Sequence, residues 1–274
     1  MSYLSKISLV LCCFIPAYSG HINAMTISTS NTGIYWILHE LTNGVDHVDF
    51  SGSLNVDPEL IDYTPKQLMK LRNYNLYVSS NLRNEKRIFS TIDRKANEIV
   101  WTPVVVSSLA DPHFWLSVQV MKELAKESRI QIEQLNPTRK PEYEVNYLSV
   151  MKQISAIDQR MNSEISANAN DKTRYLIIVH PSLTYLCKEY HLTQVAISTE
   201  NSNPGLQEIV KIRQLIVKNN IHTIFSEPQF SMQYPKIIAQ GLPVNIVQIN
   251  TLNLDWPAMM NRLITQIARS ITSQ

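Results

Sequence analysis

Residues 141–167 read PEYEVNYLSVMKQISAIDQRMNSEISA, and their apolar side chains recur at spacings of three and four residues. This stripe consists of Tyr147, Met151, Ile154, Ile157, Met161 and Ile165. Pro141 suits the first turn of a helix, and the polar run at residues 168–171 is typical of a helix end. The pattern therefore predicts one helix of about 27 residues, about 40 Å long. A single small lobe does not need such a length, so we expect this helix to run along two lobes and join them.

Short β-rich runs alternate with helical patterns on the N-terminal side of this helix. The predicted strands cover residues 26–30, 47–50 and 76–79, and the predicted helices cover residues 33–41, 65–73 and 116–135. Residues 81–100 are highly charged and predict only helix and loop. Alternation of this kind is typical of βαβ units around a parallel sheet.

A second alternating series follows the long helix. Its predicted strands cover residues 175–179, 194–198, 223–225 and 244–249, and its predicted helices cover residues 183–190, 206–219, 232–240 and 256–271. Pro235 predicts an interruption of the helix at 232–240. The fold class we expect is α/β, with two βα lobes that have central parallel sheets and are joined by one long interlobe helix. The predicted boundaries are an N-terminal α/β lobe at 25–140, the connecting helix at 141–168 and a C-terminal α/β lobe at 169–274.

Residues 1–24 are typical of a secretory signal peptide, with a short basic region, an apolar run from Ile7 to Tyr18 and a polar end. The apolar run has about 12 residues, fewer than the roughly 20 that span a bilayer. We expect cleavage after Ala24, with Gly20 as the alternative, and therefore an exported protein. The rival interpretation is a buried N-terminal helix.

The three cysteines bear on how the exported chain is processed and on whether it can form a disulfide. Lipid attachment at Cys12 is disfavoured because Leu9-Val-Leu11 is a poor lead-in for a lipidation motif. Cleavage of the signal removes Cys12 and Cys13, and Cys187 then stays as a single cysteine without an intramolecular partner. We interpret Cys187 as a small apolar residue on a helix face rather than a nucleophile.

Composition and motifs argue against a nucleic-acid partner and against an organic cofactor. The 274 residues include 25 basic and 23 acidic side chains, a formal net charge of +2. This balance does not suggest the concentrated cationic face of a nucleic-acid binder, so we expect no nucleic-acid partner. The chain contains no GxxxxGK and no GxGxxG motif, and we expect no organic cofactor.

Candidate binding residues follow the predicted strands. In parallel-sheet lobes, ligands bind at the carboxyl ends of the strands, because the connecting loops meet there. The polar residues at such positions are Asp57–Glu59, Asp111–His113, His180, Glu227 and Asn250.

Three of these positions lie in longer motifs. Residues 111–116 read DPHFWL, residues 178–180 read IVH ahead of Tyr185 and Tyr190, and residues 224–230 read IFSEPQF. With the long helix, these segments resemble the periplasmic zinc/manganese-type (cluster A-I) substrate-binding proteins of ABC transporters. The resemblance covers nearly all of the chain after the predicted signal.

The resemblance implies a divalent metal ion in the cleft between the lobes, held by about four side chains. Three histidines and a carboxylate are typical of the zinc proteins, and two histidines with two carboxylates are typical of the manganese proteins. Imidazole suits zinc, whereas added oxygen ligands favour harder ions. We expect zinc more than manganese as the bound metal, a periplasmic monomer, and an ABC permease subunit in the inner membrane as partner.

Two ligand positions of the family are matched and two are not. His113 and His180 match histidine ligands. Glu59, in Asp57-Pro58-Glu59, stands where the family has a histidine, and Asn250 stands where the family has a carboxylate. The resemblance thus implies a ligand set of His113, His180 and Glu59, completed by Asn250 or by water.

Two further acidic residues are candidates for a supporting role around the metal. We expect Glu227 to orient the cleft by hydrogen bonding. Asp255, five residues after Asn250, is a candidate to replace the lost carboxylate.

Three functions are compatible with this pattern. The first is a transport binding protein that hands a metal ion to a permease. The second is a diverged paralogue with weak or no metal binding, which acts on another small ligand or as an accessory or adhesion factor; the departures at Glu59 and Asn250 support it. The third is a zinc hydrolase, which the absence of HExxH disfavours, and we expect no enzyme.

Overall fold

The computed structural model describes residues 24–91, 99–166, 173–198 and 203–272. The predicted signal segment before Ala24, with Cys12 and Cys13, lies outside the described residues, and so does the predicted helix end at 168–171. Within the described part of the chain, no helix is both long enough and apolar enough to cross a membrane.

The first sheet has four parallel strands in the order β2-β1-β3-β4. The strands are β1 (Thr26–Thr29), β2 (His47–Phe50), β3 (Leu76–Val78) and β4 (Ile99–Trp101). The helices of this lobe are α1 (Thr32–Leu41), η1 (Pro58–Leu60, a 3-10 helix), α2 (Pro65–Leu71), α3 (Arg83–Thr91) and α4 (Val104–Ser107). Side-chain caps fix the starts of α1 and α2: the side chain of Asn31 accepts hydrogen bonds from two backbone N–H groups of α1, and Thr64 forms a capping box with Gln67 at α2.

Strand β4 corrects the expectation of helix and loop at 81–100. Among the described residues of that segment, Arg83–Thr91 forms a helix. Ile99–Trp101 forms a strand that pairs in parallel with Leu76–Val78. Three residues beside a charged run carry too weak a local signal to predict a strand, because the stabilising partner β3 is distant in the sequence. Trp101 packs, partly buried, against the main core.

The second sheet repeats the same topology, in the order β6-β5-β7-β8. Its strands are β5 (Tyr175–Ile178), β6 (Thr193–Ala196), β7 (Thr223–Ser226) and β8 (Asn245–Gln248), and its helices are α7 (Thr184–Glu189), α8 (Leu206–Lys218) and α9 (Gln233–Ala239). The interruption expected near Pro235 is absent from α9, where this proline is buried in the first turn. A first-turn residue needs no intrahelical N–H bond, so proline is tolerated there.

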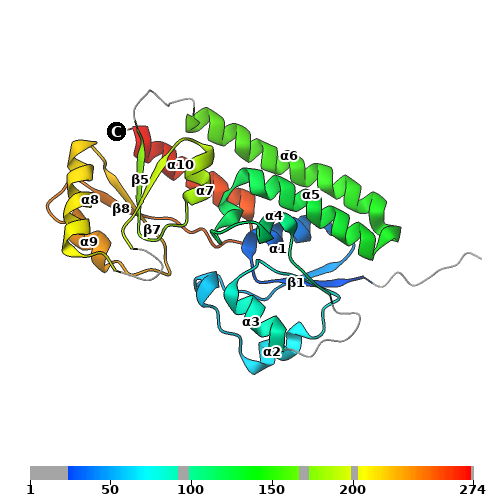
Figure 1. The fold of residues 1–274 in the computed structure, drawn as a ribbon. Coiled ribbons are helices and arrows are strands. Elements are labelled where there is room, and N and C mark those ends of the chain that lie inside the picture. The colour runs from blue at the N-terminus through cyan, green and yellow to red at the C-terminus, as the bar shows by residue number, and fades with distance from the viewer. Residues whose placement is uncertain (1–23, 92–98, 167–172, 199–202, 273–274) are drawn as a thin grey trace, which may run out of the picture.

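Three long helices connect the lobes (Figure 1): α5 (Val118–Leu135), α6 (Lys140–Glu164) and α10 (Trp256–Thr272), with the 3-10 turn η3 (Pro137–Arg139) between the first two. Helix α6 confirms the predicted long helix, and its buried residues are Tyr143, Val150, Ile154, Ile157 and Met161. Tyr147 and Met151 of the predicted stripe are only half-buried. Helix α10 follows the C-terminal sheet in the sequence and packs against α6. Arg160 of α6 donates hydrogen bonds to Asn261 and Thr265 of α10.

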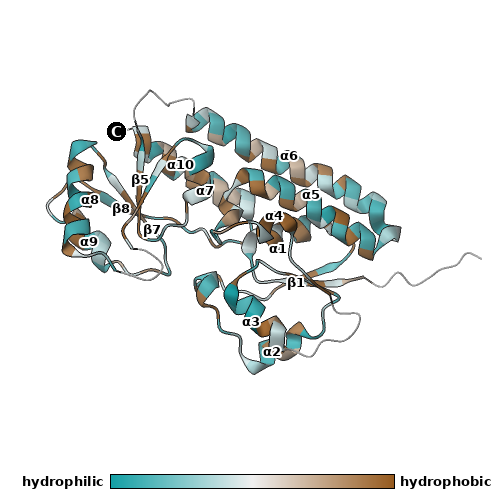
Figure 2. Cartoon of the chain, viewed as in Figure 1, coloured by the Kyte–Doolittle hydropathy of each residue, from teal (hydrophilic) through white to brown (hydrophobic). Residues whose placement is uncertain are grey.

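The two lobes share one hydrophobic core, which contains residues of β1, α1, α5, α6, β5 and α10. Figure 2 shows the hydrophobic character of α1, which lies between the first sheet and the long helices. At the junction, Trp36 stacks on Trp256 with ring centroids 5.2 Å apart. Trp115 Nε1 donates to the carbonyl oxygen of Thr251 at 2.9 Å, and Trp256 Nε1 donates to that of Trp115 at 2.6 Å. The fold is thus the predicted pair of parallel-sheet lobes, closely joined beside the loop that carries His113.

Candidate metal centre

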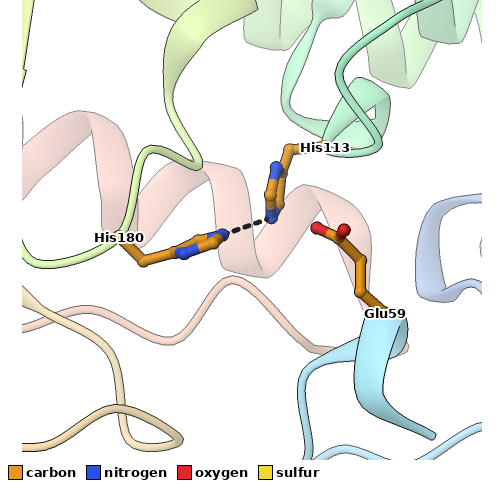
Figure 3. A group of neighbouring side chains, drawn as sticks. All are labelled: Glu59, His113 and His180. Carbon is orange, nitrogen blue, oxygen red and sulfur yellow. Dashed lines mark hydrogen bonds between the residues drawn. The ribbon is translucent and has the colours of Figure 1, made fainter. Parts of the chain in front are cut away.

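Three of the side chains singled out from the sequence converge between the lobes (Figure 3). Each of Glu59, His113 and His180 offers a ligand atom, and these atoms all lie within 4.8 Å of one another. Among the described residues, no other group of three or more His, Cys, Asp or Glu side chains is so arranged. The Nε2 atoms of His113 and His180 are 3.2 Å apart, and both histidines are buried.

His113 precedes the 3-10 helix η2 (Phe114–Leu116) and is oriented by Asp111. The Oδ1 atom of Asp111 accepts from the backbone N of His113 and lies 2.9 Å from its Nδ1. The carboxylate thereby holds Nδ1 and leaves Nε2 to face the centre. Burial lowers the pKa of His113, but the hydrogen bond and charge of Asp111 outweigh it, so the pKa is raised above its usual value.

His180 follows β5 and is oriented by ring packing. The Phe230 ring stacks on its imidazole, with centroids 4.4 Å apart and an interplanar angle of 15°. Burial, followed by the charge of His113, lowers the pKa of His180. The imidazole is therefore neutral at neutral pH, the state in which a histidine nitrogen binds metal.

Glu59 comes from η1, on the opposite side of the centre. Asp57 caps η1 by accepting a hydrogen bond from the backbone N of Glu59 at 2.9 Å. Asn84 of α3 donates to the backbone carbonyls of Pro58 and Ile61, which flank this turn. The carboxylate is thus presented by a short segment held to α3.

Glu227 directly follows β7, and its charge acts on His113. Its side chain is 1% exposed, and its Oε1 accepts from Ser182 Oγ at 3.1 Å and Thr251 Oγ1 at 2.8 Å. Burial raises the pKa of Glu227 to about 7, although both hydrogen bonds lower it. Glu227 thereby connects the turn after His180 to the segment after β8.

Asn250 and Asp255 are both exposed and both engaged in local backbone turns. Asn250 Oδ1 accepts from the backbone N of Leu252 at 2.9 Å, and Asp255 Oδ1 accepts from that of Ala258 at 3.0 Å, which caps α10. Asp255 is not a member of the group formed by Glu59, His113 and His180.

Several supporting residues were not singled out from the sequence. Phe230 lies in the quoted IFSEPQF motif, but the motif does not show that its ring stacks on an imidazole. Ser182 and Thr251 follow strand ends and could have been suspected on that basis. Asn84 carries no sequence signal, since its side chain bonds to backbone groups.

The family model for the periplasmic component A of zinc-uptake complexes matches residues 27–270. The chain belongs to this family. Membership of the zinc-uptake component A family confirms the resemblance to periplasmic metal-type substrate-binding proteins.

Curated relatives and solved structures agree with this assignment. The high-affinity zinc uptake system protein ZnuA of Bacillus subtilis is 26% identical over 148 residues, 53% of this chain and 46% of the relative. The zinc-binding lipoprotein AdcA of Streptococcus pneumoniae is 21% identical over 281 residues, 91% of this chain and 56% of the relative. The chain therefore spans about half the length of these curated relatives.

Among solved structures, a crystal structure of ZnuA superposes with a TM-score of 0.82 at 24% identity, covering 90% of this chain and 99% of that chain. The periplasmic zinc-binding protein TroA of Treponema pallidum superposes with a TM-score of 0.78 at 17% identity, covering 91% and 99%. At these identities the superpositions support the fold of the zinc-uptake component A family.

Proposed function

We propose that the protein is the extracytoplasmic solute-binding component of a metal-ion ABC transporter. It binds a divalent cation between Glu59, His113 and His180 and delivers the ion to a permease. The observation that carries the proposal is the convergence of these three side chains from separate parts of the chain. Family membership supplies the transport context.

The donor set favours zinc over manganese. Two imidazole nitrogens with one carboxylate oxygen are ligands that zinc prefers, and zinc sites with three protein ligands keep a fourth position open. Zn–N bonds of about 2.0–2.1 Å at a tetrahedral angle place two nitrogens about 3.3 Å apart. The Nε2 atoms of His113 and His180 lie 3.2 Å apart, so the distance between the two nitrogens fits such an ion. Water or Asn250 would supply the fourth ligand of the metal ion.

The same proposal covers location and partners. The protein is exported by cleavage of the segment 1–24 after Ala24 or Gly20 and works in the periplasm as a monomer, without a lipid anchor at Cys12. Its partner is a permease subunit in the inner membrane. It needs no organic cofactor and performs no catalysis, because transport requires only binding and release.

A diverged paralogue with weak or no metal binding is the second candidate. One observation favours it: the oxygens of Asn250 and Asp255 accept backbone hydrogen bonds, so neither is a ready fourth ligand. In that case the cleft binds another small ligand, or the protein acts as an accessory or adhesion factor.

Metal titration separates the two candidates. Purified, chelator-stripped protein is titrated with Zn²⁺ and Mn²⁺ by calorimetry, and its melting temperature is measured with and without each ion. We expect one Zn²⁺ per chain, weaker Mn²⁺ binding and a higher melting temperature with zinc, since a ligand of the native state stabilises it. The His113→Ala/His180→Ala double variant should fold and take up no zinc. If the wild-type protein is folded and neither ion changes its melting temperature, the result supports a diverged paralogue that does not bind metal.

A further inference from the structure

Asn84, in the first turn of α3, connects that helix to the segment that carries Glu59. Its Nδ2 donates to the carbonyl oxygens of Pro58 and Ile61, at 3.0 Å each. These two carbonyls lie on either side of Glu59 and Leu60. One amide group therefore fixes both ends of the tetrapeptide that presents the carboxylate.

Side-chain burial secures the two ends of this tetrapeptide but not its middle. Pro58 and Ile61 are buried, whereas Glu59 is only half-buried and Leu60 is 70% exposed. A cavity of about 580 Å³ is lined by Glu59 and Leu60 of this segment and by Arg83 and Lys86 of α3, among others. Because Glu59 and Leu60 border this cavity, hydrogen bonds to the carbonyls beside them help to fix the position of the carboxylate.

Helix α3 is itself a rigid support. Glu85, the residue after Asn84, is 1% exposed and accepts from Ser30 Oγ, Tyr77 OH and Ser79 Oγ at 2.6–2.9 Å. This buried carboxylate attaches the start of α3 to the carboxyl ends of β1 and β3. Asn84 thus extends from an element anchored in the lobe.

We propose that Asn84 is a positioning residue of the metal centre. Its amide sets where the Glu59 carboxylate lies relative to His113 and His180, and so raises the affinity for the metal ion. A ligand must be held within about 0.5 Å of its productive position to contribute fully. The inference rests on the proposed metal-binding function.

The direct test replaces the amide donor. Asn84→Asp keeps the shape but presents a carboxylate that cannot donate to the two carbonyls, and Asn84→Ala removes the group without adding charge. Electrostatics alone would make the Asp variant bind a cation more tightly. We expect both variants to bind Zn²⁺ at least tenfold more weakly than the wild type in calorimetry with a competing chelator.

Asn146 provides a matched control. Its Nδ2 also donates to two backbone carbonyls, those of Leu41 and Asn43, at 3.0 and 3.4 Å, but it lies on α6 outside the metal centre. Asn146→Asp and Asn146→Ala should leave zinc affinity within twofold. Equal losses at Asn84 and Asn146 would overturn the inference, because a general loss of rigidity would then explain both.

A double-mutant cycle with Glu59 tests whether Asn84 acts through that residue. In a Glu59→Ala background, Asn84→Ala should change zinc affinity by less than twofold. The same loss in both backgrounds overturns the inference. Suppose that the wild type binds zinc and the double-histidine variant does not. If Asn84→Ala then binds zinc as tightly as the wild type, the positioning role of Asn84 is wrong and the proposed function stands. If the folded wild type binds no zinc, the proposed function fails together with the positioning role.

Discussion

The Nε2 atoms of His113 and His180 lie 3.2 Å apart, although 67 positions separate the two residues in the sequence. The loops that carry them are tied together by α7. The Tyr185 hydroxyl contacts the backbone N and O of Asp111, and Glu189 accepts from the backbone N of Val118 at the start of α5. The histidine pair is therefore a fixed feature of the lobe junction. The carboxylate of Glu59 comes from a turn that Asn84 of α3 holds separately, so this third side chain is positioned independently of the histidine pair.

Asp111→Asn should weaken zinc binding without removing a ligand. The carboxylate orients His113 through Nδ1 and raises the pKa of that imidazole, and loss of such a partner costs about 10- to 100-fold in metal affinity. Calorimetry measures the affinity, and the histidine resonances in NMR report the pKa of His113, which should fall in the variant. Asp49→Asn is the control, because Asp49 contacts the exposed His47 at 3.0 Å. Unchanged zinc affinity in Asp111→Asn would contradict the orienting role.

Phe230→Leu should reduce zinc affinity more modestly. The aromatic face fixes the plane of the His180 ring, and stacked aromatic pairs contribute about 0.5–1.5 kcal/mol, which corresponds to roughly 2- to 10-fold in affinity. The control is Phe89→Leu, since Phe89 packs on Tyr77 at 4.4 Å in another cluster. Equal effects of the two substitutions on zinc affinity would show that the stacking on His180 has no specific role.

The sequence predicted the elements whose signal is local and strong. The seven-turn periodicity before Ile165 predicted α6, and alternation of short runs predicted the parallel sheets on either side of it. The missed strand β4 has three residues and owes its existence to pairing with β3, a contact between residues more than twenty positions apart. Tertiary pairing of that kind leaves little trace in a local pattern.

The candidate site was predictable to a similar degree. His113, His180 and Glu59 follow from the motifs and from the rule that ligands gather at strand ends, and the structure brings all three together. The position of Asn250 in a motif gave no information about its local turn, in which its oxygen accepts from Leu252. The Nδ2 of Asn84 donates to backbone carbonyls of residues 23 and 26 positions away, so no side-chain pattern indicates this contact.

Trp256→Phe should destabilise the junction that holds the His113 loop. The substitution removes the indole N–H that donates to the buried carbonyl of Trp115 and leaves that carbonyl without this partner, at a cost of about 1–3 kcal/mol. Urea unfolding of the metal-free protein measures the change in free energy. Trp36→Phe is the control for lost ring area, because Trp36 stacks on Trp256 in the same cluster. A smaller loss for Trp256→Phe than for Trp36→Phe would contradict this assignment.

Glu227 should make the metal-free protein less stable as the pH rises. Burial raises the pKa of its carboxyl to about 7, from a usual value of 4.5. Between these two values the unfolded chain releases the proton while the folded chain retains it, so stability falls as the pH rises through this window and then levels off. The shift corresponds to about 3 kcal/mol.

The measurement compares wild type and Glu227→Gln by urea unfolding at pH values from 5 to 8, in the presence of a chelator. The neutral amide does not titrate, so the stability of the variant relative to the wild type should increase by about 2.5 kcal/mol across this range, which begins above the unfolded pKa. Glu142→Gln is the control, because that carboxyl lies at the surface beside Arg139 and the pKa of Glu142 is lowered instead. Parallel stability profiles for wild type and Glu227→Gln would show that Glu227 ionises normally in the fold.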